Sequence, residues 1–267
     1  MEIVFRILLF VVGACIGSFL CCQARRLHHN LTHKTKLKSK RSLCLHCKKP
    51  LKWYDNLPLI SWLSLKGKCR HCHHKIGLAE FLSELTTAIA FPLLSLTIDP
   101  ATATPLAWVI FIAILIFTST LIFLAIYDGL YGELPTICLI TAIIFAIVIL
   151  ALQTWLTLSA TPFTSSLISN PLLSILILGG LYLLLYLISK GKWVGDGDWL
   201  LATAIAIVLA HPLLALITLF LSNFIACLIT LPLAKGNYKT KIHFGPFLVT
   251  AFIITYSFSP FFITLML

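Results

Sequence analysis

Long apolar runs, separated by short polar segments, decide what this chain of 267 residues can fold into. A run of about 20 apolar residues is long enough to cross the hydrocarbon core of a bilayer as a helix. Only 11% of the residues are charged, whereas soluble domains carry about 25%. The sequence therefore predicts an all-α polytopic membrane protein with about eight transmembrane helices, at 3–22, 79–97, 106–126, 134–157, 171–189, 198–210, 212–233 and 246–266. This count requires one long apolar run to break at His211-Pro212.

The basic residues gather in a few of the segments between these runs. The net charge is +11, and 14 of the 20 Lys and Arg residues fall within 23–78. Because Lys and Arg mark the cytoplasmic side of membrane proteins, we expect the N-terminus outside and the loops at 127–133, 190–197 and 234–245 inside. The loops at 98–105 and 158–170 contain no Lys or Arg and are expected outside. Nucleic-acid binding by the basic segment is an alternative, but this placement of the charge favours the membrane, and we expect no nucleic acid as a partner.

Three segments follow from this topology: a first transmembrane helix at 1–22, a cytoplasmic Cys-rich basic loop at 23–78, and a seven-helix membrane domain at 79–267. The loop is too short and too poor in apolar residues to build its own core, so it needs a staple such as a metal ion.

Four cysteines in the loop have the spacing of a zinc ribbon. Two Cys-x2-Cys pairs are separated by 21 residues, and they consist of Cys44, Cys47, Cys69 and Cys72. Four thiolates at this spacing suit a tetrahedral structural zinc site. Paired cysteines in a reducing cytoplasm favour a metal over disulfides. Reduced free thiols and disulfides are the alternatives, and the neighbouring His46, His71, His73 and His74 are either substitute ligands or solvated loop residues.

Two acidic clusters stand at the ends of predicted helices, where charge is costly and therefore indicates function. The topology places Asp128 at the cytoplasmic end of the third helix and Asp198 at the cytoplasmic start of the sixth, at one depth. Two carboxylates close together in a low-dielectric site do not both ionise. One can act as general base on an attacking water while the protonated one polarises the scissile carbonyl. This pattern predicts an aspartic protease with Asp128 and Asp198 as its catalytic residues.

The surrounding residues have structural interpretations as well as functional ones. Asp196 or Asp198 could be a helix N-cap, Asp128 could be an ordinary helix-end residue, and Glu133 could be a first-turn charge of the fourth helix. Gly195 and Gly197 permit positive φ and a close backbone approach, so that an extended substrate peptide could lie against them. The predicted substrate-binding group is Gly195, Asp196, Gly197 and Glu133.

Five ordered stretches, between residue 13 and about residue 250, resemble the type IV prepilin peptidase family. They are Gly17-Ser18-Phe19-Leu20 with Arg25-Arg26, the loop from Arg41 to Cys72, Asp128 with Pro135, Gly195-Asp196-Gly197-Asp198, and His243-Phe244-Gly245-Pro246-Phe247. The fourth is similar to the Gly-x-Gly-Asp motif that the family shares with presenilin-type proteases. Thr136 and Leu200 depart from the family pattern at supporting positions.

The resemblance implies a protein of the bacterial inner membrane. It implies cleavage of a short basic leader after a Gly, at the cytoplasmic face, in prepilin or pseudopilin substrates. It also implies Asp128 and Asp198 as the catalytic pair. Many members N-methylate the new N-terminus, so S-adenosylmethionine is an expected cofactor beside structural zinc.

Three other functions remain as alternatives. One is a presenilin-type protease that cuts other membrane segments, although the Cys-rich loop argues against it. Another is a proton-coupled transporter that uses Asp128 and Asp198 as a relay. A transporter of this kind predicts a matching symmetry between the two halves of the sequence, and none is evident. The last is a non-catalytic membrane scaffold anchored by a zinc ribbon.

Overall fold

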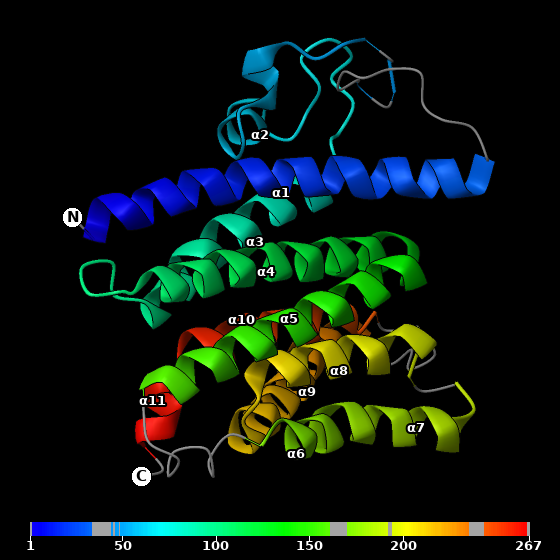
Figure 1. Cartoon of the computed structure of the whole chain (residues 1–267). Coiled ribbons are helices and arrows are strands. Elements are labelled where there is room, and N and C mark those ends of the chain that lie inside the picture. The colour runs from blue at the N-terminus through cyan, green and yellow to red at the C-terminus, as the bar shows by residue number, and fades with distance from the viewer. Residues whose placement is uncertain are drawn as a thin grey trace. The chain divides into compact units, whose positions relative to one another are not determined.

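The computed structural model describes residues 2–33, 44, 46–47, 49–160, 170–191, 194–234 and 243–265. Nearly all of this described part is helical (Figure 1), and a β-bridge joins Lys68 to Lys75. Most of the predicted outer loop at 158–170 and the Arg41-Ser42-Leu43 portion of the basic loop lie outside the described residues. The chain forms two compact units, Met1–Pro92 and Leu93–Leu267, which are taken in turn. The division into three topological segments stays a prediction.

The first unit is built on two long helices, α1 (Glu2–His33) and α3 (Leu78–Leu94), with the short helices η1 (Trp53–Asn56) and α2 (Ile60–Ser64) between them in sequence. Two glycines on one face of α1 meet α3. A Cβ on Gly13 would lie 2.5 Å from the carbonyl oxygen of Thr87, and one on Gly17 would overlap the backbone of Ser83. Small residues four apart therefore let the two backbones approach closely, as in packed membrane helices.

Two contacts attach α2 to α3. The backbone N–H of Leu59 donates to the buried carboxylate of Glu84 over 2.7 Å. The ring of Trp62 stacks on Phe81 with 4.6 Å between centroids. Because a buried carboxyl group needs a hydrogen-bond partner, this contact ties the Cys-rich loop to a membrane helix at Leu59.

The second unit contains the remaining helices. They are η2 (Ser95–Thr97), α4 (Pro105–Tyr131), α5 (Thr136–Ala160), α6 (Pro171–Ile175), the π-helical turn η4 (Leu176–Gly180), α7 (Leu181–Ser189), α8 (Asp196–Leu209), α9 (Pro212–Ala234), α10 (Gly245–Ser257) and α11 (Ser259–Thr264). The segments α6, η4 and α7 follow one another without a break and form one predicted membrane span.

The prediction of an all-α polytopic membrane protein is confirmed, and each predicted apolar run is helical. Six helical segments of the described residues are long and apolar enough to cross a membrane: Glu2–Thr32, Leu78–Thr97, Pro105–Tyr131, Thr136–Thr157, Pro171–Ser189 and Pro212–Pro232. The predicted spans at 198–210 and 246–266 correspond to shorter helices, α8 with 14 residues and α10 with 13. The expected break at His211-Pro212 is present, since α8 ends at Leu209 and Ala210 turns into the left-handed region with φ of 50°.

Helix α8 forms the centre of the second unit. It packs on α5, α6, η4 and α7 (Figure 1), and every residue from Ala204 to Leu209 is buried. A helix that is apolar on all sides belongs inside a protein, and its alanines allow neighbouring helices to come close. The interior position of α8 also buries Asp198, which belongs to its first turn.

Candidate active site and metal centre

Asp128 lies in the last turn of α4, and its side chain is held in place by two neighbouring features. Helix α4 ends in a left-handed Gly132 with φ of 70°, whose N–H donates to the carbonyl oxygen of Asp128 over 2.7 Å. The residue is only 6% exposed. Its Oδ2 accepts a hydrogen bond of 3.0 Å from the N–H of Gly245, and its Oδ1 lies 3.7 Å from Nδ1 of His243.

Gly245 is the first residue of α10, so its free N–H belongs to a helix N-terminus. The first N–H groups of a helix have no partner within the helix and favour a nearby anion. A Cβ on this residue would lie 2.9 Å from Oδ2 of Asp128, which is too close for any larger side chain to fit without movement. The Gly245-Pro246 sequence therefore supplies a donor at a distance that only glycine allows.

Asp198 occupies the third position of α8 and repeats this arrangement. Asp198 is 9% exposed, and its Oδ2 accepts a hydrogen bond of 3.0 Å from the N–H of Gly195 at the start of the helix. The N-cap of α8 is Gly195, so Asp198 is an acidic residue of the first turn and not the N-cap itself. The carboxylate of Asp198 also interacts electrostatically with that of Asp128. Two helices far apart in sequence therefore place the two buried acidic residues close enough to interact electrostatically.

The predicted substrate-binding residues lie at the start of α8 and on the connection after α4. Neither Gly195, with φ of −69°, nor Gly197, within α8, uses the positive φ that glycine permits. A Cβ on Gly197 would lie 2.6 Å from Cβ of Leu134, so this glycine accommodates a neighbouring side chain of the same unit. Asp196 is exposed and interacts electrostatically with Asp198.

Glu133 is exposed on the connection between α4 and α5, and it interacts electrostatically with Tyr127. Helix α5 begins at Thr136, so Glu133 precedes the helix instead of standing in its first turn. The roles of Gly195, Asp196, Gly197 and Glu133 in substrate binding stay predictions.

Sequence reasoning assigned no role to three residues that the structure places around the aspartates. Gly245 and His243 contact Asp128 directly. Tyr182 of α7 interacts electrostatically with Asp198. A Gly-Pro step is a recognisable helix start, which could have indicated Gly245. No local pattern distinguishes Tyr182 from the other aromatic residues of its apolar run.

The four loop cysteines form a cluster in the first unit. The sulfur atoms of Cys44, Cys47, Cys69 and Cys72 all lie within 4.8 Å of one another, and those of Cys44 and Cys72 are 3.8 Å apart. Sulfur atoms arranged tetrahedrally at 2.3 Å around a zinc ion would be about 3.8 Å apart. The cluster can therefore hold a metal ion and fits structural zinc, and it consists of cysteines without any of the four nearby histidines.

The local backbone favours the thiolate form that a metal requires. N–H groups of Cys72 and His71 donate to the sulfur of Cys69 and lower the pKa of the Cys69 thiol to about 7. A thiolate is the form of cysteine that binds metal ions. The turn from Cys69 to His74 is closed by a hydrogen bond of 2.9 Å from the N–H of Cys69 to the carbonyl oxygen of His74.

Comparisons with known proteins agree with this picture. Residues 11–98 match the family model described as the Bacterial Peptidase A24 N-terminal domain. A 104-residue segment is 42% identical to the prepilin leader peptidase/N-methyltransferase of Vibrio cholerae and covers 37% of this chain and 41% of that relative. A protein of the same name from Aeromonas hydrophila is 28% identical over 215 residues, which cover 79% of this chain and 69% of the relative. These matches make the chain similar to the type IV prepilin peptidase family.

The type IV prepilin peptidase match is strongest in the first unit. The segment 11–98 contains the four cysteines, whereas Asp128 and Asp198 lie beyond it. The chain covers less than half the length of the first three curated relatives it matches, from Vibrio cholerae, Myxococcus xanthus and Escherichia coli, at 41%, 25% and 39%. No solved structure matches the chain.

Proposed function

We propose that this protein is a membrane aspartic endopeptidase that cleaves the basic leader of prepilins or pseudopilins after a Gly, at the cytoplasmic face of the bacterial inner membrane. The observation that supports it most directly is the meeting of two buried carboxylates, Asp128 and Asp198, within one unit. Uncompensated buried carboxylates are costly, so their pairing at helix ends calls for a functional explanation. The names of the curated relatives supply the substrate class.

In the proposed mechanism, the two carboxylates share the work of peptide hydrolysis. One, ionised, takes a proton from the attacking water, and the other, protonated, donates a hydrogen bond to the scissile carbonyl. The N–H groups of Gly245 and Gly195 each hold one carboxylate oxygen. The second oxygen of Asp128 lies 3.7 Å from Nδ1 of His243, and these contacts set the orientation of the carboxylates before the substrate arrives.

Methylation of the new N-terminus is the second activity in the names of the Vibrio and Aeromonas relatives. S-adenosylmethionine would be the methyl donor, but none of the contacts described above forms a site for it. Zinc bound by the four cysteines would supply structure to the basic loop rather than a reacting atom.

A cleavage assay tests the proposal. A substrate with a basic leader, Gly, Phe and an apolar stem is co-expressed with the wild-type chain and with Asp128→Asn or Asp198→Asn, and its mass is followed. Removal of a general base or acid typically costs about 10²- to 10⁴-fold in rate, so neither variant should yield product in the time of the assay. An added methyl mass on the wild-type product would establish the second activity.

Asp99→Asn provides the matched control, because Asp99 is exposed in a loop and caps the N–H of Ala101. This variant should cleave like the wild type. Normal cleavage by Asp128→Asn or Asp198→Asn, at equal amounts of inserted protein, would refute the aspartate mechanism.

A further inference from the structure

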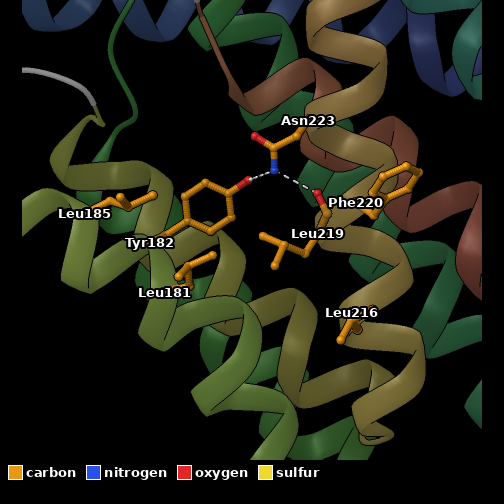
Figure 2. A pocket seen from close by; sticks show the side chains of 7 residues that line it. All are labelled: Leu181, Tyr182, Leu185, Leu216, Leu219, Phe220 and Asn223. Carbon is orange, nitrogen blue, oxygen red and sulfur yellow. Dashed lines mark hydrogen bonds between the residues drawn. The ribbon is translucent and has the colours of Figure 1, made fainter.

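A groove of about 380 Å³ opens between α7 and α9 in the second unit. Five apolar side chains form most of it (Figure 2): Leu181, Leu185, Leu216, Leu219 and Phe220. Both helices belong to segments apolar enough to cross a membrane, and Leu216 and Phe220 are exposed. Exposed apolar side chains of such segments face the interior of the bilayer, so this groove is open to a ligand that arrives within the membrane.

Polar groups line one part of the groove. The hydroxyl of Tyr182 lies 3.4 Å from Oγ of Ser222 and accepts a hydrogen bond of 3.4 Å from Nδ2 of Asn223. Figure 2 shows Tyr182 and Asn223 pointing toward each other across the groove, with Asn223 also donating to the carbonyl oxygen of Leu219. The amide oxygen of the exposed Asn223, by contrast, has no hydrogen-bond donor among the described residues.

This unpaired oxygen indicates the chemical class of the occupant. An amide oxygen in hydrocarbon costs free energy unless it accepts a hydrogen bond, and a lipid acyl chain has no donor. A peptide segment has donors, and the first four N–H groups of any helix lack an internal partner. The groove therefore suits an apolar helical segment whose N-terminal turn reaches Asn223.

Tyr182 lines the groove and also interacts with the aspartate site. Tyr182 is 3% exposed, its ring packs on Phe244 at 5.3 Å between centroids, and it interacts electrostatically with Asp198. Phe244 directly precedes Gly245, the donor to Asp128. The side chain of Tyr182 therefore lines the groove and also contacts Phe244, the neighbour of Gly245, and interacts with Asp198.

We propose that the groove between α7 and α9 binds the apolar stem of the substrate, with the first two helical turns after the cut beside Tyr182 and Asn223. This assignment rests on the proposed function, because it names the part of the prepilin-type substrate that the same site recognises. The aspartates then act on the polar segment that precedes the stem. A basic leader and a basic cytoplasmic loop do not attract each other by charge, so recognition of the substrate depends on the apolar stem.

Photo-crosslinking from the groove tests the assignment in the full-length protein in membranes. A benzoylphenylalanine replaces Leu216 or Phe220 in the Asp198→Asn background, which keeps the substrate intact, and replaces Leu187 in the control. Leu187 is an exposed residue of α7 that does not line the groove. Both groove positions should crosslink to the first two turns of the stem at least about tenfold more than the control.

The alternatives give different products. Adducts with lipid alone, crosslinks between two copies of this chain, or equal yields from Leu187 would overturn the assignment. Wild-type cleavage of the same substrate is measured in parallel. Absence of cleavage would count against the protease function, whereas cleavage without a groove crosslink would count against the groove alone.

A kinetic variant provides a second measurement. Leu216→Trp should fill part of the groove and raise KM for a stem-containing substrate by about tenfold, equivalent to about 1.4 kcal/mol, while kcat stays within about twofold. Leu187→Trp should leave both constants unchanged. An unchanged KM in stably inserted Leu216→Trp would contradict stem binding in the groove.

Discussion

At the scale of single residues, the site depends on a repeated arrangement in which a glycine N–H at a helix start holds a buried carboxylate. Gly195 does this for Asp198 within one helical turn, and Gly245 does it for Asp128 from 117 positions away. The local contact could be anticipated from the sequence, since acidic residues favour helix starts. The distant one could not, because it depends on how α10 packs beside the end of α4.

Gly245→Ala should abolish most of the cleavage activity while the protein still folds. The new Cβ would lie 2.9 Å from Oδ2 of Asp128, so the carboxylate or the start of α10 must move. Misplacement of a catalytic group by about 1 Å can cost about 100-fold, and we expect a loss of that order in kcat/KM.

Gly129→Ala is the control for this variant. A Cβ at Gly129 would meet only Cγ of Pro246, at an ordinary distance of 3.8 Å, although the residue is next to Asp128. Its activity should be close to wild type. Equal activity of the two variants would show that the hydrogen bond from Gly245 does not position Asp128.

At the scale of elements, hydropathy located the helices better than it located their ends. The first helix was expected to end at residue 22, but α1 continues to His33. Ala, Arg and Leu in this extension are good helix formers. A search for apolar runs takes no account of helix propensity and therefore ends the helix too early. The run 246–266 is interrupted at Phe258, where α10 gives way to α11, and Pro260 is a signal for this break that hydropathy alone does not weigh.

The metal site of the Cys-rich loop was the most predictable feature, because the spacing of the four cysteines is known from the sequence without any knowledge of the fold. Purified full-length protein should contain about one zinc per chain, measured by elemental analysis. Cys69→Ser and Cys72→Ser should lose most of the metal, because a structural site needs all four thiolates.

Cys227→Ser is the matched substitution, since Cys227 is exposed on α9 and belongs to no cysteine cluster among the described residues. It should retain the wild-type zinc content. Zinc in the Cys69→Ser and Cys72→Ser proteins at the wild-type level would exclude the four-cysteine site.

At the scale of the whole molecule, charge placement predicts an orientation that the helices alone do not determine. Epitope tags inserted at Ala101 and at Gly191 test it, because both residues are exposed in connections between helices. Since the basic segments mark the cytoplasmic side, the tag at Ala101 should be accessible to antibody on intact spheroplasts. The tag at Gly191 should become accessible only after permeabilisation.

A tag inserted at either position must leave substrate cleavage detectable, which serves as the control for folding. The reverse pattern of accessibility would place the aspartates on the outer side and would contradict cytoplasmic cleavage of the leader. Equal accessibility at both positions would contradict the predicted number of spans between them.

The contact between Gly197 and Leu134 has a consequence for the history of the acidic motif. Because a side chain at 197 would collide with Leu134, the size of one residue limits the size of the other. Replacement of this glycine during evolution would therefore require a smaller residue at 134 first. Two positions 63 apart in the chain thus share one space, and the order in which they can change is fixed.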